Sequence, residues 1–242
     1  MCIAIYKPRD KEISKDILKI CHESNPDGGG FMFNHDNTLH IEKGFMRFDD
    51  FWNSYKKIDS IKYDMLIHFR IKTHGAISKA NCHPFLVSEK IGFIHNGIID
   101  IKTKGTESDT MAFNERILKN VNDLHDVIKS KGIQALIANS IGHSKLVFLD
   151  NENNHTIINE HLGIWEDGSW FSNDSFESCK YGAFSFDKDY QYEIQEPFIS
   201  CYDCNSELST KFEIDNEICS SCAEDDEYYN KWFKRENKRR WF

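Results

Sequence analysis

Cys2-Ile3-Ala4-Ile5-Tyr6 is the apolar stretch behind Met1, and it predicts a short buried strand that begins with a cysteine. A strand start would hold a nucleophile rigidly. If Met1 is removed, Cys2 carries both a thiol and a free α-amine, and the ordinary pKa of that amine is about 7.7–8.0. The amine can then act as the base for its own thiol, so one residue supplies both nucleophile and base. Most cysteines near an N-terminus have no such role, so the hypothesis depends on segments further along the chain.

The composition is that of an ordinary globular protein. The 242 residues are 40% hydrophobic and 29% charged, which suffices for one substantial core. The formal net charge of −9 makes the chain as a whole a poor generic binder of nucleic acid. The sequence contains neither an apolar run of about 18 residues that would span a bilayer nor a signal peptide at its start. We therefore expect a cytoplasmic protein that binds no membrane, whose eight cysteines serve catalysis or metal binding rather than disulfides.

Predicted strands and helices follow one another in blocks. Strands are expected at 2–6, 38–46, 63–71, 91–94, 144–149, 155–159 and 163–172, and helices at 13–22, 48–58, 107–119 and 121–139. This arrangement is more typical of a layered α+β fold than of a doubly wound α/β fold.

A turn signal, Asn25-Pro26-Asp27-Gly28, precedes two further glycines. Three consecutive glycines are more than a turn needs, and they allow a backbone to approach another group closely. The segment is therefore either a flexible hairpin loop or a loop of the functional site. It is no phosphate-binding P-loop, because the Gly-Lys-Ser/Thr ending of that motif is missing.

Three polar groups at the ends of predicted elements have both a structural and a functional interpretation. Arg70 ends an apolar strand, where it either faces solvent or binds a carboxylate through its planar fork. Asn96-Gly97 is either a hairpin turn or an oxyanion hole made by the Asn side-chain amide and the Gly backbone N–H. Asp109 either caps the helix 107–119, a role that Ser108 also fits, or holds a substrate ammonium group.

One kind of substrate satisfies all the functional interpretations together. A cysteine nucleophile needs an acyl carbon, an arginine binds a carboxylate, an aspartate binds an ammonium group, and two N–H donors stabilise an oxyanion. An α-amino acid with a side-chain amide offers all of these groups, and glutamine is the obvious one.

Six short runs, in order, resemble those of the glutaminase domain of class II glutamine amidotransferases, which are N-terminal-nucleophile (Ntn) hydrolases. The runs are Met1-Cys2, Asn25-Pro26-Asp27-Gly28, Arg70-x-x-Thr73-His74-Gly75, Asn81-x-His83-Pro84-Phe85, His95-Asn96-Gly97 and Ser108-Asp109-Thr110. Each run alone is weak, but six in this order with the cysteine at position 2 are specific. The resemblance covers residues 2–195, and the matched runs end at Thr110.

The resemblance implies a fold and a reaction. The expected fold is an αββα four-layer sandwich of two antiparallel sheets, with a small C-terminal zinc ribbon in this chain. Cys2 would be nucleophile and base, and Asn96 and Gly97 would form the oxyanion hole. The side-chain amide of glutamine would give a γ-glutamyl thioester and ammonia, and the thioester would give glutamate.

The same resemblance implies the groups that bind the substrate. Arg70 would bind the α-carboxylate of glutamine and Asp109 its α-amine, while Thr73 and His74 would line the pocket. Members fused to a synthase are expected to carry an aromatic gate after the arginine. This chain has Ile71 at that position, so gating by that side chain is not expected here.

Residues 201–222 contain two Cys-x-x-Cys pairs separated by 14 residues, close to the spacing of four-cysteine zinc sites. Such a site is closed, so its zinc is structural rather than catalytic, and it stabilises a segment too small for a core of its own. We expect a zinc ribbon over residues 199–224 and no organic cofactor, with disulfides or free thiols as the alternative. The expected zinc ligands are Cys201, Cys204, Cys219 and Cys222.

The tail, residues 225–242, interleaves basic and aromatic residues and is predicted to be helical. It either docks on the body of the protein or on a partner, or binds nucleic acid; docking is the favoured interpretation.

No synthase or ATP-binding segment is recognisable, so ammonia would serve a separate acceptor enzyme. Two alternatives to the glutaminase remain: an Ntn amidase that acts on another γ-glutamyl or acyl amide, and a non-catalytic zinc-ribbon protein that recognises nucleic acid or a protein.

Overall fold

The computed structural model describes residues 2–72, 76–177, 206, 210 and 219–221. The chain divides into two units, Met1–Ser185 and Phe186–Phe242. All the strands and helices given below belong to the first unit.

Two antiparallel sheets form the centre of this unit. The six-stranded sheet has the order β3-β2-β4-β1-β10-β9, and the four-stranded sheet has the order β5-β6-β7-β8. The first sheet contains β1 (Ile3–Lys7), β2 (Gly29–His35), β3 (Thr38–Phe45), β4 (Met65–Phe69), β9 (Ile164–Glu166) and β10 (Ser169–Phe171). The second contains β5 (Phe85–Ser88), β6 (Ile91–Asn96), β7 (Lys145–Asp150) and β8 (His155–Ile158).

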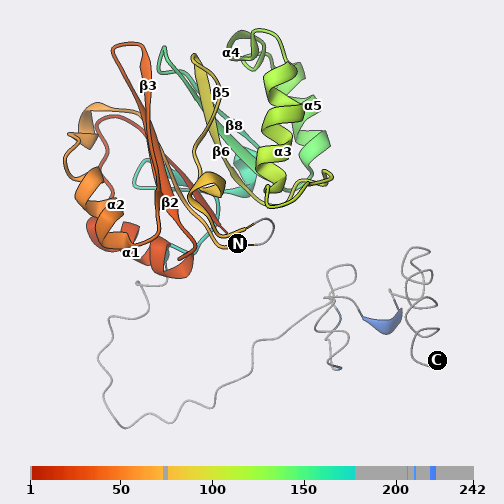
Figure 1. The fold of residues 1–242 in the computed structure, drawn as a ribbon, viewed down its shortest axis with the longest axis horizontal. Coiled ribbons are helices and arrows are strands. Elements are labelled where there is room, and N and C mark those ends of the chain that lie inside the picture. The colour runs from red at the N-terminus through yellow and green to blue at the C-terminus, as the bar shows by residue number, and fades with distance from the viewer. Residues whose placement is uncertain (1, 73–75, 178–205, 207–209, 211–218, 222–242) are drawn as a thin grey trace. The chain divides into compact units, whose positions relative to one another are not determined.

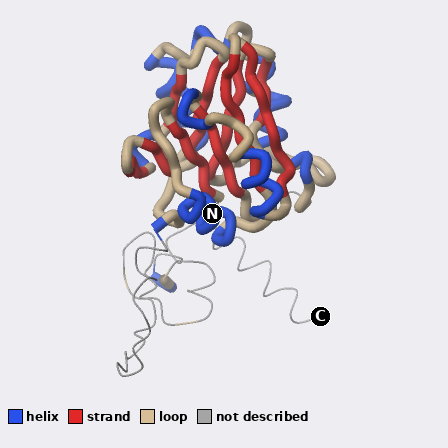
Figure 2. The backbone as a smooth tube through the Cα atoms, turned by 90° about the vertical axis from the view of Figure 1, so that its left-hand side faces the viewer, coloured by secondary structure: helices blue, strands red, loops and turns tan. Residues whose placement is uncertain are grey.

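Helices cover the outer face of each sheet, as Figure 1 shows: α1 and α2 lie outside the first sheet, and α3 and α5 outside the second. The α-helices are α1 (Lys15–Ser24), α2 (Phe48–Tyr55), α3 (Asp109–Arg116), α4 (Leu124–Val127) and α5 (Lys131–Ile141). Short 3-10 turns lie at η1 (Ser60–Lys62), η2 (Lys79–Asn81), η3 (Leu118–Asn120) and η4 (Glu160–Leu162). In Figure 2 the strands run side by side through the middle of the unit with the helices around them. The expectation of a layered α+β fold with two antiparallel sheets is confirmed.

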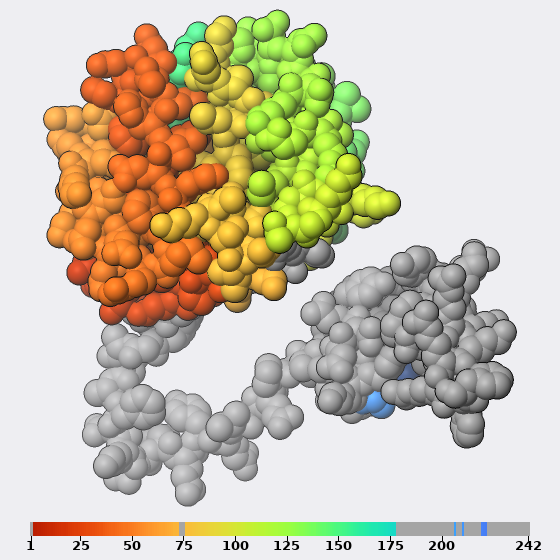
Figure 3. Space-filling model, viewed as in Figure 1, coloured from red at the N-terminus to blue at the C-terminus, as the bar shows by residue number. Residues whose placement is uncertain are grey.

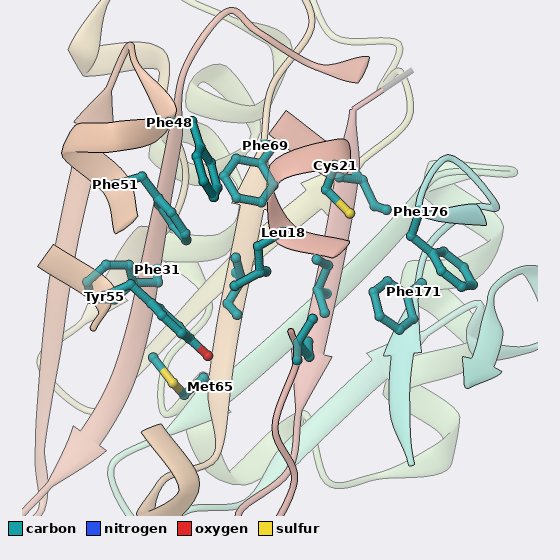
Figure 4. Close-up of a cluster of buried hydrophobic side chains, with 14 residues drawn as sticks. Leu18, Cys21, Phe31, Phe48, Phe51, Tyr55, Met65, Phe69, Phe171 and Phe176 are labelled. Atoms are coloured by element: carbon teal, nitrogen blue, oxygen red, sulfur yellow. The ribbon is translucent and has the colours of Figure 1, made fainter. Parts of the chain in front are cut away.

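Three apolar clusters hold the layers together, and the alternation of side chains along a strand explains them. On β1, Ile3 and Ile5 point toward α1 and α2, into the cluster drawn in Figure 4. Ala4 and Tyr6 point the other way, into the cluster between the two sheets. A third cluster, which includes Phe93 of β6, packs the second sheet against its helices. The strand β1, which directly follows Cys2, is therefore buried on both faces.

The structure corrects several expectations from the sequence: β1 begins at Ile3 rather than at Cys2, and β2 and β5 are strands that were not expected. Residues 121–139 are not one helix: Ser130 separates α4 from α5. Residues 163–172 are not one strand but the hairpin of β9 and β10, which turns at Asp167 and Gly168, both with positive φ. The glycine segment is no flexible loop, because Gly29 and Gly30 open β2, with a register shift between them.

Candidate active site

Cys2 directly precedes β1, and strand pairing places it against the end of β4. Ile3 pairs with Phe69 in the antiparallel register of β1 and β4, so the residues that follow Phe69 come to lie beside Cys2. Cys2 Sγ donates to the carbonyl oxygen of Ile71 at 3.2 Å, and the N–H of Ile71 lies 3.4 Å from the same sulfur. The carbonyl of Cys2 accepts a hydrogen bond of 2.7 Å from Asn173 Nδ2.

The thiol of Cys2 is not activated by its surroundings. Burial raises its pKa, and the N–H of Ile71 and the charge of Arg70 oppose that effect only in part. Because the thiolate is the nucleophilic form of cysteine, a thiol held in this way needs a base within reach.

Arg70 is buried, with 4% of its surface exposed, so the solvent-facing alternative is wrong. Its Nη1 donates to the carbonyl of Ala76 at 3.2 Å. Its backbone is held by the turn before β2: the N–H of Arg70 donates to Gly28 O at 2.8 Å, and the N–H of Asp27 donates to Arg70 O at 2.8 Å. The Asp27 carboxylate also accepts a hydrogen bond of 2.7 Å from the N–H of Lys72.

Close packing explains why residue 28, the first of the three consecutive glycines, is a glycine. Gly28 has φ +124°, and a Cβ at this position would overlap Cys82 Sγ. Only glycine allows the backbone to pass here and hold Arg70. The expectation of a close backbone approach is confirmed, although the neighbouring glycines belong to a strand.

Asn96 ends β6 and Gly97 follows it. The two residues do not form a hairpin, since β6 pairs with β5 and β7 and the described residues 97–108 lead into α3. Asn96 Nδ2 donates to Ser172 Oγ at 2.5 Å, which points the amide toward the first sheet. Gly97 has φ +135°, and a Cβ there would overlap Ser144 Oγ and lie 2.7 Å from Ser144 Cα. Gly97 therefore has to be glycine.

Asp109 is the first residue of α3, and Ser108 is the N-cap, accepting from the N–H of Met111 at 3.2 Å. The Asp109 carboxylate is consequently not the cap. Its Oδ2 accepts from the N–H of Ile99 and its Oδ1 from the N–H of Thr110, both at 2.9 Å. These two bonds fix the orientation of a carboxylate that is 6% exposed.

Groups from each of these segments line one pocket, although Asn96 itself is not among its lining residues. Cys2, Arg70, Gly97 and Asp109 contribute to its wall, together with His83 and His95. The pocket is small and partly open to solvent. A thiol, a guanidinium group and a carboxylate therefore line one small pocket.

Three buried histidines lie beside this pocket, and one of them, His68, was not expected there from the sequence. His68 Nε2 lies 2.8 Å from His83 Nδ1 and 2.9 Å from the carbonyl oxygen of His95. His95 Nδ1 lies 2.8 Å from Thr110 Oγ1. Burial lowers the pKa of all three, that of His68 to about 3. The signal in the sequence was a polar residue inside the apolar run of β4.

Ser172 and Asn173, which follow β10, also went unrecognised. Ser172 Oγ accepts from Asn96 and, at 2.9 Å, from the N–H of Ala4. Asn173 holds the Cys2 carbonyl. Nothing in the local sequence marks them, because their role comes from the pairing of β10 with β1.

Several expected site residues lie outside the described residues. These are Thr73 and His74 in the pocket, and Cys201, Cys204 and Cys222 of the expected zinc site; Cys219 is described and is buried. Within the described part of the chain, no group of three or more metal-ligating side chains could hold a metal ion. In that same part, no helix is long and apolar enough to cross a membrane.

The first unit is thus an α+β sandwich with a cysteine pocket at the ends of β1, β4 and β6. No protein-family model matches the chain, and no curated protein matches it. Among solved structures, it is similar to glutamine phosphoribosylpyrophosphate (PRPP) amidotransferase from B. subtilis, complexed with ADP and GMP. The similarity has 15% sequence identity and a TM-score of 0.48, and it covers 73% of this chain and 43% of the other.

Proposed function

We propose that this protein is a glutaminase of the class II amidotransferase type, which hydrolyses the side-chain amide of glutamine through a thioester on Cys2. One observation carries the proposal: Cys2, Arg70, Gly97 and Asp109 line the same pocket although they are distant in the sequence. Each of these residues has a partner group on one substrate, an α-amino acid with a side-chain amide.

Arg70 and Asp109 bind the amino-acid end of the substrate. The Arg70 guanidinium group pairs with the α-carboxylate, for which its planar fork is suited. Asp109 pairs with the α-ammonium group, and its two backbone hydrogen bonds leave lone pairs on both oxygens. Thr73 and His74 complete the pocket around the substrate.

The reaction begins when Met1 is removed and the α-amine of Cys2 becomes free. The amine takes the thiol proton as the sulfur attacks the amide carbon. The thiol requires such a base because burial raises its pKa. The N–H of Gly97 and the amide of Asn96 stabilise the oxyanion of the tetrahedral intermediate. Asn96 has two N–H bonds, and only one is needed for Ser172.

The intermediate collapses when the C–N bond breaks and the α-ammonium group gives its proton to the leaving nitrogen, which departs as ammonia. Water then attacks the thioester with the α-amine again as base, the C–S bond breaks and glutamate leaves with the thiol restored. The balance is glutamine and water to glutamate and ammonia. The ammonia serves a separate acceptor enzyme, a synthetase that aminates its own substrate.

The decisive experiment combines the mass of the N-terminus with an assay of glutamate release from glutamine. We expect purified protein to lack Met1 and to release glutamate, and Cys2→Ala to abolish release. Cys21→Ala is the matched control, because Cys21 lies on the buried face of α1 and does not line the pocket. Protein that has lost Met1 and still releases no glutamate would overturn the proposal. Activity on other γ-glutamyl or acyl amides, with none on glutamine, would favour the amidase alternative.

Zinc binding is a separate proposal that rests on sequence spacing alone. Cys201, Cys204, Cys219 and Cys222 hold one structural zinc as four thiolates. Elemental analysis should find one zinc per chain, and replacing Cys201 and Cys204 with Ser should abolish it. A metal-free chain with all four cysteines intact would contradict it.

A further inference from the structure

We infer that Asn81 is a positioning residue, which sets the separation between Arg70 and Asp109 and so matches the pocket to an α-amino acid. The inference rests on the proposed function. Asn81 is 2% exposed and lies at the end of η2, where its own N–H donates to Ser78 O at 3.2 Å. Its side chain contacts both segments that carry the substrate-binding groups.

The contact toward Arg70 passes through the carbonyl oxygen of Ala76. Asn81 Nδ2 donates to this oxygen at 2.8 Å, and Arg70 Nη1 donates to the same oxygen at 3.2 Å. The amide of Asn81 therefore fixes the acceptor against which the guanidinium group rests.

The contacts toward Asp109 use the other atoms of the same amide. Asn81 Oδ1 accepts from the N–H of Ser108 at 3.1 Å, and Ser108 is the N-cap of the helix that Asp109 begins. Asn81 Nδ2 also donates to Thr106 O at 2.9 Å, and the N–H of Ala76 donates to that oxygen at 3.2 Å. One carboxamide thus joins the residues after β4 to the start of α3.

The location of this connection explains why it is needed. Strand pairing holds Arg70, through β4, and Gly97, through β6, but no strand holds the described residues 76–81 or 97–108. In Figure 3 the part of the chain around β5, coloured yellow, lies at the surface between the orange first part and the green helices. Small displacements of groups that hold a substrate can lower rates by about 100-fold. Side-chain hydrogen bonds must therefore fix residues 76–81 and 97–108, which the sheets do not hold.

The test measures binding in Cys2→Ala protein, so that it does not depend on turnover. Calorimetry compares L-glutamate with glutarate, which lacks the α-ammonium group. Asn81→Leu removes the three side-chain hydrogen bonds at nearly constant shape. Asn34→Leu is the matched control, because Asn34 is equally buried and joins β2 to Asn151 through a single 2.8 Å bond away from the pocket.

We expect Asn81→Leu to weaken L-glutamate binding by on the order of 10–100-fold and to reduce the preference over glutarate by a similar factor, while Asn34→Leu leaves the preference unchanged. An unchanged preference in Asn81→Leu overturns the inference. If Asn81→Leu does not fold by circular dichroism, the milder Asn81→Ser is judged by the same criterion. Failure of the Cys2→Ala parent to bind L-glutamate is a different outcome, and it overturns the proposed function together with the inference.

Discussion

The sulfur of Cys2 lies 3.2 Å from the carbonyl oxygen of Ile71, a residue 69 positions further along the chain. The carbonyl accepts from the S–H, so this contact orients the thiol in its protonated form. The antiparallel register of β1 with β4 produces the contact, because it brings the residue before Ile3 beside those after Phe69. Because the thiol is protonated, it can act as a nucleophile only when a neighbouring base removes its proton.

Blocking the α-amine of Cys2 should therefore abolish activity without disturbing the fold. A variant with a Gly-Ser extension before Cys2 keeps the thiol but converts the amine to an amide. Loss of a general base lowers rates by about 10²–10⁴-fold, and we expect at least that loss in glutamate release. Full activity in the extended protein, verified by intact mass, would show that another group is the base.

Arg70→Lys should raise the KM for glutamine by about 10–100-fold. Lysine keeps the charge but loses the planar fork that pairs with a carboxylate, and hydrogen bonds to charged groups contribute about 1.5–3 kcal/mol. The exposed Arg47→Lys is the control. Steady-state kinetics of both variants decide the point, and an unchanged KM in Arg70→Lys would remove that residue from the substrate site.

Gly97→Ala should lower kcat by about 10²–10³-fold, the usual effect of losing one oxyanion donor. The added Cβ would meet Ser144, at a φ that disfavours side chains, so the N–H has to move. Gly142→Ala is the matched control, because Gly142 also has positive φ but has nothing within 4 Å of an added Cβ. Equal losses of kcat in the two variants would indicate backbone strain rather than a lost donor.

The buried histidines should make the protein less stable in mild acid. Burial lowers the pKa of His68, His83 and His95 in the folded state below the ordinary value of 6.5. The unfolded chain then binds more protons as the pH falls below about 6.5, so the free energy of unfolding falls, by up to about 1.4 kcal/mol per pH unit for each histidine.

Urea unfolding at pH 5, 6, 7 and 8 measures this slope. We expect His68→Gln to reduce the slope between pH 6 and 5 by up to about 1.4 kcal/mol per pH unit, the contribution of one proton. His143→Gln, which replaces an exposed histidine, is measured beside it as the control. A slope that His68→Gln does not alter would mean that His68 is protonated in the folded protein.

Lys7→Met should destabilise the fold by at least about 2 kcal/mol. Lys7 is fully buried at the end of β1, and its ammonium group donates to the carbonyl oxygens of Pro8, Lys11, Ser60 and Tyr63 at 2.8–3.0 Å. A buried acceptor left without a donor costs about 1–3 kcal/mol. The control is Lys19→Met, which breaks only an exposed pair with Glu23. Equal urea midpoints in the two variants would contradict the prediction.

Local patterns predicted the elements whose faces are clearly apolar. The alternation in β1 and β4 and the stripe in α1 are visible in the sequence, because a face that packs on a core must be apolar at the matching period. The strands β2 and β5 were not predicted. Two further failures, at 121–139 and 163–172, arose where a continuous apolar pattern crosses a break. Ser130 and the Asp167-Gly168 turn end the regular backbone there, while the apolar residues continue.

For the candidate site, too, the sequence predicted some features and only the structure decided others. Residue types predicted Cys2, Arg70, Asn96, Gly97 and Asp109, because each has a chemistry that a glutamine substrate requires. From the sequence alone, Arg70 could either face solvent or bind an anion, and Asn96-Gly97 could form either a hairpin turn or an oxyanion hole. Burial of Arg70 and the pairing of β6 with β5 and β7 exclude the structural alternatives. Thr73, His74 and the zinc ligands stay predictions.

By itself, the sequence determined the α+β class, the buried strand directly after Cys2 and the list of groups able to act on an amide, since these depend on local pattern and side-chain chemistry. Only the tertiary structure decided which of those groups share a pocket and which residues hold them. Ser172, Asn173, His68 and Asn81 act through contacts between segments that are distant in the chain. Such contacts arise from strand register and layer packing, which no short stretch of sequence encodes.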